Sequence, residues 1–265
     1  MADALVLAVI AFLVFIVSFT FANVGLGGGG LYVPILLLMY VDDDDIVVPI
    51  SLCLAAATAI SSTLTHRRKG FVDLRIGKRL VAGALLGAIL GTSFTIDVLT
   101  VRNFKIFFAS LLFVLAILLL NDWRRGNSVD EDVPARLSGK RMTAASVATA
   151  ASGFVSGSAG VGGGVFNVPI ITYILGRRTR TAIGTSSLLI IPTAAFGFVI
   201  FAVRVGLRPE FGIIPILFPL ALGGAYVGSR WGLEALRARS VALLFIGVVF
   251  LADALVVLEV LGKLG

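Results

Sequence analysis

The sequence predicts an all-α, polytopic integral membrane protein with about eight full spans and two short half-helices, arranged as two inverted repeats. Its 265 residues are 58% hydrophobic and 14% charged, with a mean hydropathy of +1.04. A soluble domain of this length has no means of hiding so much apolar surface. A glycine-rich motif occurs twice inside apolar stretches, and the basic residues gather in alternate loops. These three observations carry the prediction.

Eight apolar stretches have roughly the 20 residues that a transmembrane helix needs. They are 3–22, 46–65, 77–97, 103–121, 142–158, 181–203, 210–230 and 240–262. The first lacks a basic start and is too long for a signal peptide, so we expect a retained helix. We therefore predict a first transmembrane repeat (1–121), a cytoplasmic linker (122–141) and a second transmembrane repeat (142–265), together forming one membrane domain.

The two remaining apolar pieces, 31–41 and 165–176, each follow a glycine cluster and are short for a full crossing. The motif that precedes them runs from Gly25 to Pro34 and returns 135 positions later, from Gly160 to Pro169. Matched interruptions of this kind point to the substrate site in transporters. Small-residue ladders at Gly83, Gly87 and Gly91, and at Gly224 and Gly228, predict close helix packing.

Glycine runs leave backbone N–H and C=O groups unshielded, which costs several kcal/mol per group in hydrocarbon. We expect each run to lead into a short helix beginning near Gly30 or Val165. A helix start offers free N–H groups and about half a positive charge. Two such starts aimed at the middle of the membrane suit a small anion.

Polar side chains cluster at the same level, where hydroxyl and amide donors suit oxyanions. Asn23 aligns with Ser158, and Tyr32 with Asn167; at an offset of 136, Ser51 matches Ser187 and Gly70 matches Gly206. Alternatively, the hydroxyls bond carbonyls of their own helices. The predicted substrate-binding residues are Asn23, Gly25, Gly27, Gly28, Gly29, Gly30, Tyr32, Ser51, Ser158, Gly160, Gly162, Gly163, Gly164, Asn167, Thr185, Ser186 and Ser187.

Two residues are candidates for proton coupling. Asp253 lies deep in the last predicted span, where an acid is costly and commonly functional; bonding to a neighbouring helix is the equal alternative. His66 begins the basic segment 66–70, for which a solvated inner loop is the favoured alternative. The sequence has no spacing typical of metal ligands and no nucleophile–base pair, so we expect no metal, no cofactor and no enzymatic activity.

The loops predict orientation. Of the 22 Lys and Arg residues, 17 fall in 67–79, 124–141, 177–180 and 230–239, whereas the acidic run Asp42–Asp45 falls on the other side. The positive-inside rule then places both termini outside, and five membrane segments in each half make the repeats inverted. The net charge of +7 is spread over short loops, which argues against a nucleic-acid partner.

With these motifs in view, the sequence resembles the TauE/SafE sulfite exporter family, also grouped as the toluene-sulfonate uptake permeases. The resemblance rests on the twin GxGGGxxxVP segments, on Ser51-Leu52 and Thr185–Leu188, and on the loop His66–Asp73. It covers the whole chain, although the second half lacks the His and Asp of that loop. It implies secondary transport of sulfite or sulfonates across a prokaryotic plasma (inner) membrane, with export the favoured direction.

Several alternatives stay open at this stage. The chain is alternatively an uptake permease, a carrier of another small anion such as a carboxylate, or, less favoured, a channel. The expected partners are a small anionic substrate and the lipid bilayer. The sequence leaves the anion, the direction, the coupling ion and the oligomeric state undetermined.

Overall fold

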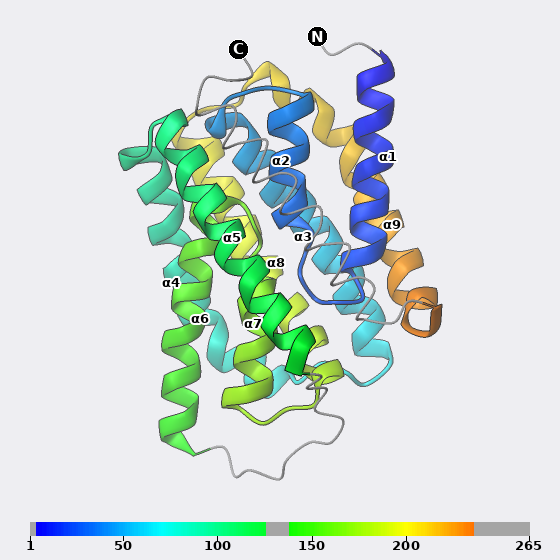
Figure 1. Ribbon diagram of the computed structural model, residues 1–265, viewed down its shortest axis with the longest axis vertical. Coiled ribbons are helices and arrows are strands. Elements are labelled where there is room, and N and C mark those ends of the chain that lie inside the picture. The colour runs from blue at the N-terminus through cyan, green and yellow to red at the C-terminus, as the bar shows by residue number, and fades with distance from the viewer. Residues whose placement is uncertain (1–3, 126–137, 236–265) are drawn as a thin grey trace.

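The computed structural model describes residues 4–125 and 138–235, and in these residues it contains helices and no strand (Figure 1). The α-helices are α1 (Ala4–Phe21), α2 (Gly29–Met39), α3 (Asp44–Arg68), α4 (Leu74–Val98), α5 (Val101–Arg125), α6 (Gly139–Ala159), α7 (Gly164–Pro169), α8 (Thr179–Arg204) and α9 (Ile214–Ala235). A π-helix, η1 (Ile170–Ile174), continues α7, and a 3₁₀ helix, η2 (Pro209–Ile213), precedes α9. The predicted all-α class is confirmed for this part of the chain.

Five helices of the described residues are long and apolar enough to cross a membrane. They are α1, α3, α4, α8 and the continuous segment Pro209–Trp231. Helices α5 and α6 coincide with the predicted spans 103–121 and 142–158, and they extend into both ends of the predicted linker. The predicted span 240–262, with Asp253, lies outside the described residues, so the count of eight stays a prediction.

The two glycine clusters interrupt the helices as predicted. Helices α2 and α7 begin at Gly29 and Gly164, one residue before the predicted starts, each after a glycine in the left-handed region (φ 81° at Gly28 and 69° at Gly163). The 11 residues of α2 span about 16 Å, roughly half of the hydrocarbon core of a bilayer. Helix α2 is therefore a half-helix.

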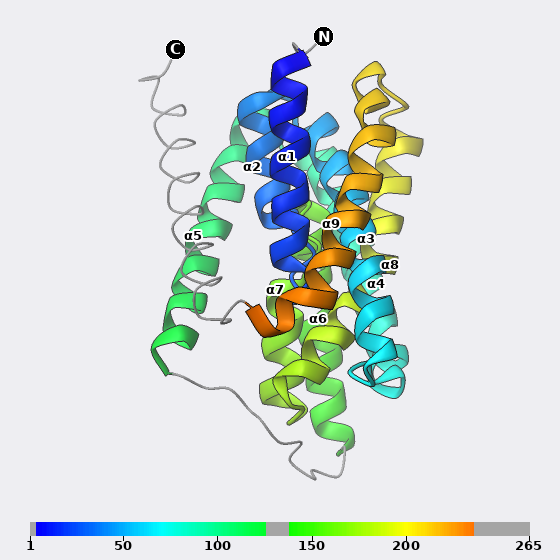
Figure 2. The same ribbon diagram turned by 90° about the vertical axis from the view of Figure 1, so that its right-hand side faces the viewer.

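The half-helices enter from opposite ends of the bundle. Helix α1 runs from one end toward the middle, and α2 returns to the end from which α1 came (Figures 1 and 2). Helix α6 rises from the opposite end, and α7 with η1 returns there (Figure 1). Both glycine turns thus lie near the middle of the bundle, beside the long, buried helix α3.

The predicted glycine ladders are packing surfaces. Gly87 and Gly91 of α4 lie directly against the carbonyl groups of Ala150 and Phe154 on α6, where a Cβ atom would overlap them. Gly224 and Gly228 of α9 lie in the same way against carbonyls of α1. Such close backbone approach is how helices pack in lipid without a hydrophobic driving force.

The two ends of the bundle differ in charge. The loops after α3 and η1 reach one end, here called the basic end, which carries the Lys and Arg residues of 67–79 and 177–180 (Figure 1). The loops after α2 and α8 reach the other, here called the acidic end, which carries Asp42–Asp45. At the acidic end, Lys105 pairs with Asp42 at 2.6 Å, and Arg204 pairs with Asp97 through both carboxylate oxygens.

Candidate functional site

The two glycine breaks contact each other. A Cβ atom on Gly29 would overlap the carbonyl of Gly160 and the backbone of Val161. A Cβ atom on Gly164 would overlap the carbonyl of Gly25 and come within 2.8 Å of Leu26 Cα. Because the obstacles are backbone atoms, no side chain can move aside, and only glycine fits at either position.

Two serine hydroxyls join the breaks. Ser51 Oγ, from α3, donates to the Gly160 carbonyl at 2.8 Å and lies 3.5 Å from that of Gly29. Ser186 Oγ, from α8, lies 2.9 Å from the Gly25 carbonyl and 3.3 Å from that of Gly164. Each serine therefore bonds the carbonyls of both breaks.

These contacts correct the predicted pairing of the two halves. The partners of Ser51, Gly29 and Gly160, correspond at an offset of 135 to those of Ser186, Gly164 and Gly25. The equivalent of Ser51 is therefore Ser186. The offset of 136, which matched Ser51 with Ser187, is wrong by one residue here. Ser187 instead lies 3.0 Å from the Ser62 hydroxyl and donates to the Ile183 carbonyl of its own helix.

The helix starts keep backbone donors available at the middle of the bundle. The Gly28 carbonyl accepts the N–H groups of Leu31 and Tyr32, and the Gly163 carbonyl accepts those of Phe166 and Asn167. Among the described residues, no acceptor receives the N–H groups of Gly29, Gly30 or Gly164. Such donors at a helix start favour negative charge.

The first break is filled by a tyrosine. Tyr32 is fully buried, and its ring lies so close to Gly28 that a Cβ atom there would come within 2.7 Å of it. Its hydroxyl lies 2.7 Å from Thr58 Oγ1. The ring occupies the space beside the first helix start, and its polar atom is satisfied within the protein.

The second break keeps polar groups without partners. Asn167, the counterpart of Tyr32, is 3% exposed, and its Oδ1 atom has no hydrogen-bond partner among the described residues. The buried Ser156 hydroxyl also has none. Ser152 donates to the Gly163 carbonyl at 2.8 Å, and both serines lie about Gly163. Oδ1 is itself an acceptor, so an oxyanion here would be bound by the Asn167 NH₂ group, the Ser156 hydroxyl and the backbone N–H groups of the helix start, none of which carries a fixed charge.

The remaining predicted residues surround the breaks. Gly27 and Gly162 both lie next to the side chains of Ile190 and Ala55. Gly27 lies closer to Ile190 than to Ala55, whereas Gly162 lies about equally close to both. Asn23 donates to the Phe19 carbonyl, and its Oδ1 atom has no partner among the described residues. The Ser158 hydroxyl bonds within its helix, as the alternative interpretation expects. The Thr185 hydroxyl is turned away from the breaks, because it accepts the Asp73 N–H at 3.0 Å.

His66 does not begin a solvated loop. It lies in the last turn of α3, is 1% exposed, and has its Nε2 atom 3.2 Å from the Ala22 carbonyl. That carbonyl follows the end of α1 and so has no helical partner, which explains why His66 and Ser62 both approach it. Nδ1 is buried without a partner among the described residues. A role in proton coupling stays a prediction for His66, as for Asp253.

Sequence reasoning missed three of the residues around the breaks, namely Thr58, Ser152 and Ser156. The sequence offered a signal for Thr58, because a second threonine, Thr193, follows at the offset of 135 that relates the glycine motifs. In the structure, both hydroxyls donate to a carbonyl four residues earlier. Ser152 and Ser156 have no such counterpart to find. Among the described residues, no group of three or more His, Cys, Asp or Glu side chains is placed to hold a metal ion.

Comparison with known proteins decides the family. Residues 10–254 match the family model described as "Sulfite exporter TauE/SafE". This chain belongs to the TauE/SafE family. The chain is 26% identical over 222 residues to the "Probable membrane transporter protein YdhB" of Bacillus subtilis (strain 168), a match that covers 84% of this chain and 89% of the relative. No solved structure matches. As a TauE/SafE member, the chain is a multi-pass membrane transporter and not an enzyme.

Proposed function

We propose that this TauE/SafE protein is a secondary transporter that exports sulfite or a small sulfonate across a prokaryotic plasma membrane. The anion is held at the middle of the membrane, where the two glycine breaks meet. The observation that carries the proposal is the set of N–H groups at the starts of α2 and α7 that no acceptor in the described part of the chain receives. Together with the NH₂ group of Asn167 and the Ser156 hydroxyl, which has no partner among the described residues, they supply donors and positive helix dipoles without a fixed charge.

The membrane potential supports the proposed direction. Moving an anion out of a cell with a negative interior releases about 2.3 kcal/mol per charge per 100 mV. Export therefore needs no coupling ion, whereas uptake of the same anion needs one. The proposed direction is the one that the described site can support without a titratable carboxylate beside the breaks.

The same proposal includes inverted repeats with the basic end in the cytoplasm and both termini outside. The matched hydrogen bonds of Ser51 and Ser186 support it, and so do half-helices that enter from opposite ends. In a variant in which Cys53 is replaced by Ala, we expect Thr100→Cys to react with an impermeant maleimide in intact cells. Arg68→Cys is expected to react only after the cells are permeabilised. The reverse pattern would contradict the orientation.

The function is tested by flux in proteoliposomes at fixed potential and pH. Radiolabelled sulfite is compared with a sulfonate and a carboxylate. Wild-type protein is expected to move sulfite or the sulfonate faster than the carboxylate. Faster movement of the carboxylate would instead select the alternative carrier, and sulfite flux only with an imposed proton gradient would select an uptake permease.

A matched pair of variants tests the site. Gly163→Val places a side chain beside Ser152 and Ser156 and is expected to lower flux at least tenfold. Gly206→Val is the control, because Gly206 also has a positive φ (88°) but has no atom within 4 Å of its Cβ position. Both variants are compared at equal amounts of monodisperse protein. Equal flux in the two would remove the breaks from the transport path.

A further inference from the structure

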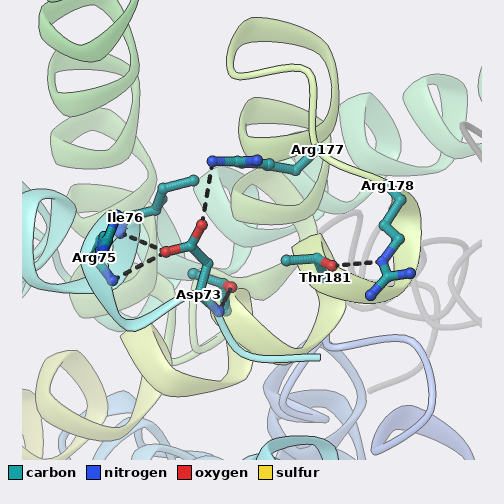
Figure 3. Close-up of polar contacts among 7 residues, drawn as sticks. Asp73, Arg75, Ile76, Arg177, Arg178 and Thr181 are labelled. Atoms are coloured by element: carbon teal, nitrogen blue, oxygen red, sulfur yellow. Dashed lines mark hydrogen bonds and ion pairs between the residues drawn. The ribbon is translucent and has the colours of Figure 1, made fainter. Parts of the chain in front are cut away.

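A pocket of about 470 Å³ opens at the basic end, apart from the glycine breaks. It lies between the loop that follows α3 and the loop that follows η1 (Figure 3). Its lining includes Gly70, Asp73, Arg75, Arg177, Arg178 and Thr181. Among the described residues, three guanidinium groups and one carboxylate give the lining an excess of positive charge.

We propose that this pocket binds the oxyanion group of a small anion, either a sulfite or sulfonate or the phosphate of a lipid headgroup. We also propose that the pocket is a station, meaning a cytoplasmic site that holds the anion before transport; this second role rests on the proposed function. The binding of an oxyanion in the pocket does not depend on the proposed function. The three arguments are the commitment of the carboxylate, the arrangement of the arginines and the connection to the breaks.

Among the described residues, one carboxylate lines the pocket, that of Asp73, and it is already committed to protein donors. Its Oδ1 atom accepts the N–H groups of Arg75 and Ile76 at 3.0 and 3.1 Å, which caps the start of α4. Its Oδ2 atom lies 3.4 Å from Arg177 Nη2 (Figure 3). Because these partners hold the carboxylate in place, it offsets one of the three guanidinium charges in the described lining.

The two arginines are held in position by protein contacts. Arg178 donates through Nε to Thr181 Oγ1 at 3.0 Å, and its guanidinium lies 5.3 Å from the centre of the Phe71 ring. Arg177 pairs with Asp73 through Nη2, but its buried Nε atom has no acceptor among the described residues. The Arg177 side chain as a whole is 24% exposed, so an oxyanion in the pocket can meet its guanidinium group. Guanidinium groups suit oxyanions geometrically.

Helix α8 connects the pocket with the breaks. Thr181 lines the pocket, Thr185 holds the Asp73 backbone, and Ser186 bonds both glycine breaks. Eight residues separate Arg178 from Ser186, which corresponds to about 12 Å along the helix. The pocket is therefore placed to hold an anion one short step from the breaks, on the side that carries the basic loops.

The pocket is tested by equilibrium binding of radiolabelled sulfite to purified protein in the transport-deficient Gly163→Val background. We expect Arg177→Gln and Arg178→Gln each to weaken sulfite binding at least fivefold. Arg79→Gln is the matched control, because it removes an exposed charge at the same end outside the pocket lining. It is expected to change the affinity less than twofold. If the two pocket variants bind sulfite as tightly as the parent protein, or if Arg79→Gln weakens binding as much as they do, the pocket does not bind sulfite. The proposal is then overturned, unless the lipid measurement below shows that a lipid phosphate occupies the pocket.

Native mass spectrometry of protein from phosphatidylglycerol and phosphatidylcholine nanodiscs identifies a lipid source. Loss of bound phosphatidylglycerol in Arg177→Gln and Arg178→Gln, but not in Arg79→Gln, supports the oxyanion pocket and overturns its role as a transport station. Proteoliposome flux separates the two proposals. Raised KM for sulfite in the pocket variants supports the station, unchanged KM overturns it, and pocket binding by a protein without any anion flux overturns only the transport function.

Discussion

The first and second glycine breaks share one backbone frame and differ in the side chains around it. In both, glycines with positive φ precede a helix start, and a serine from a neighbouring long helix bonds the carbonyls of the two breaks. At the first break, the Tyr32 ring fills the space beside Gly28. At the second, the smaller Asn167 leaves its Oδ1 atom without a partner among the described residues. The backbone conformation and the bridging serine are thus the same at both breaks, but the side chains around them differ.

This difference distinguishes the residues that stabilise the breaks, which are the bridging serines, from the residues that contact a ligand, which are the side chains around them. Unpaired carbonyls inside a membrane are costly wherever they occur, so each break needs its serine. No comparable constraint fixes the side chain at position 32 or 167, and these have diverged. Because the unpartnered Ser156 hydroxyl and the NH₂ group of Asn167 can donate, we expect the anion to contact the second break and Tyr32 to close the first.

The largest expected effect tests the shared frame. Gly29→Ala and Gly164→Ala each place a Cβ atom against a carbonyl of the other break, and backbone cannot repack as a side chain can. We expect both to lower the free energy of unfolding by at least about 3 kcal/mol. The measurement is the unfolding midpoint in detergent, with the yield of monodisperse protein.

Gly212→Ala provides the control for this pair. Gly212 has no atom within 4 Å of its Cβ position and an ordinary φ, so the change is expected to stay within about 0.5 kcal/mol. If Gly29→Ala or Gly164→Ala had the same unfolding midpoint as the wild-type protein, the two breaks would not be in contact.

The next effect tests the difference between the breaks. Asn167→Leu keeps the side-chain size but removes the amide, so we expect sulfite flux to fall at least tenfold in a folded protein. Tyr32→Phe keeps the ring that fills the first break and removes only its hydroxyl. We expect it to retain most of the flux and to lose about 1 kcal/mol of stability, the usual value of a hydrogen bond.

These two variants act as controls for each other, since they change equivalent positions. Both are measured by proteoliposome flux and by thermal unfolding at matched protein amounts. Lost flux in Tyr32→Phe with normal flux in Asn167→Leu would reverse the assignment and place the anion at the first break.

Much of the fold could be predicted because hydropathy and glycine act locally. An apolar run of about 20 residues predicts a helix whatever surrounds it, and the glycine clusters placed the starts of α2 and α7 within one residue. His66 was harder to predict. Its basic neighbours indicate a loop, but the free Ala22 carbonyl that it approaches comes from another helix.

The register between the halves shows the limit of a single offset. The glycine motifs and the bridging serines are related by 135 positions, Gly70 and Gly206 by 136, and Gly91 and Gly228 by 137. Extra residues accumulate in loops, where insertions cost little. The drift displaced the predicted partner of Ser51 by one residue. Only the carbonyls that the two serines share identify the correct pair.

The smallest expected difference is the one between the two bridging serines, and it tests whether they are equivalent. Ser51→Ala and Ser186→Ala each leave buried carbonyls of both breaks without their side-chain donor. We expect each to lower the free energy of unfolding by about 1–3 kcal/mol. Because the two hydrogen-bond sets correspond residue by residue, the two losses should agree within about 0.5 kcal/mol. Ser110→Ala removes an exposed hydroxyl that bonds only its own helix, to the Ile106 carbonyl, and is the control. If Ser186→Ala were as harmless as Ser110→Ala while Ser51→Ala was costly, the frame itself would be asymmetric, and the contrast between Tyr32 and Asn167 would no longer suffice to choose between the breaks.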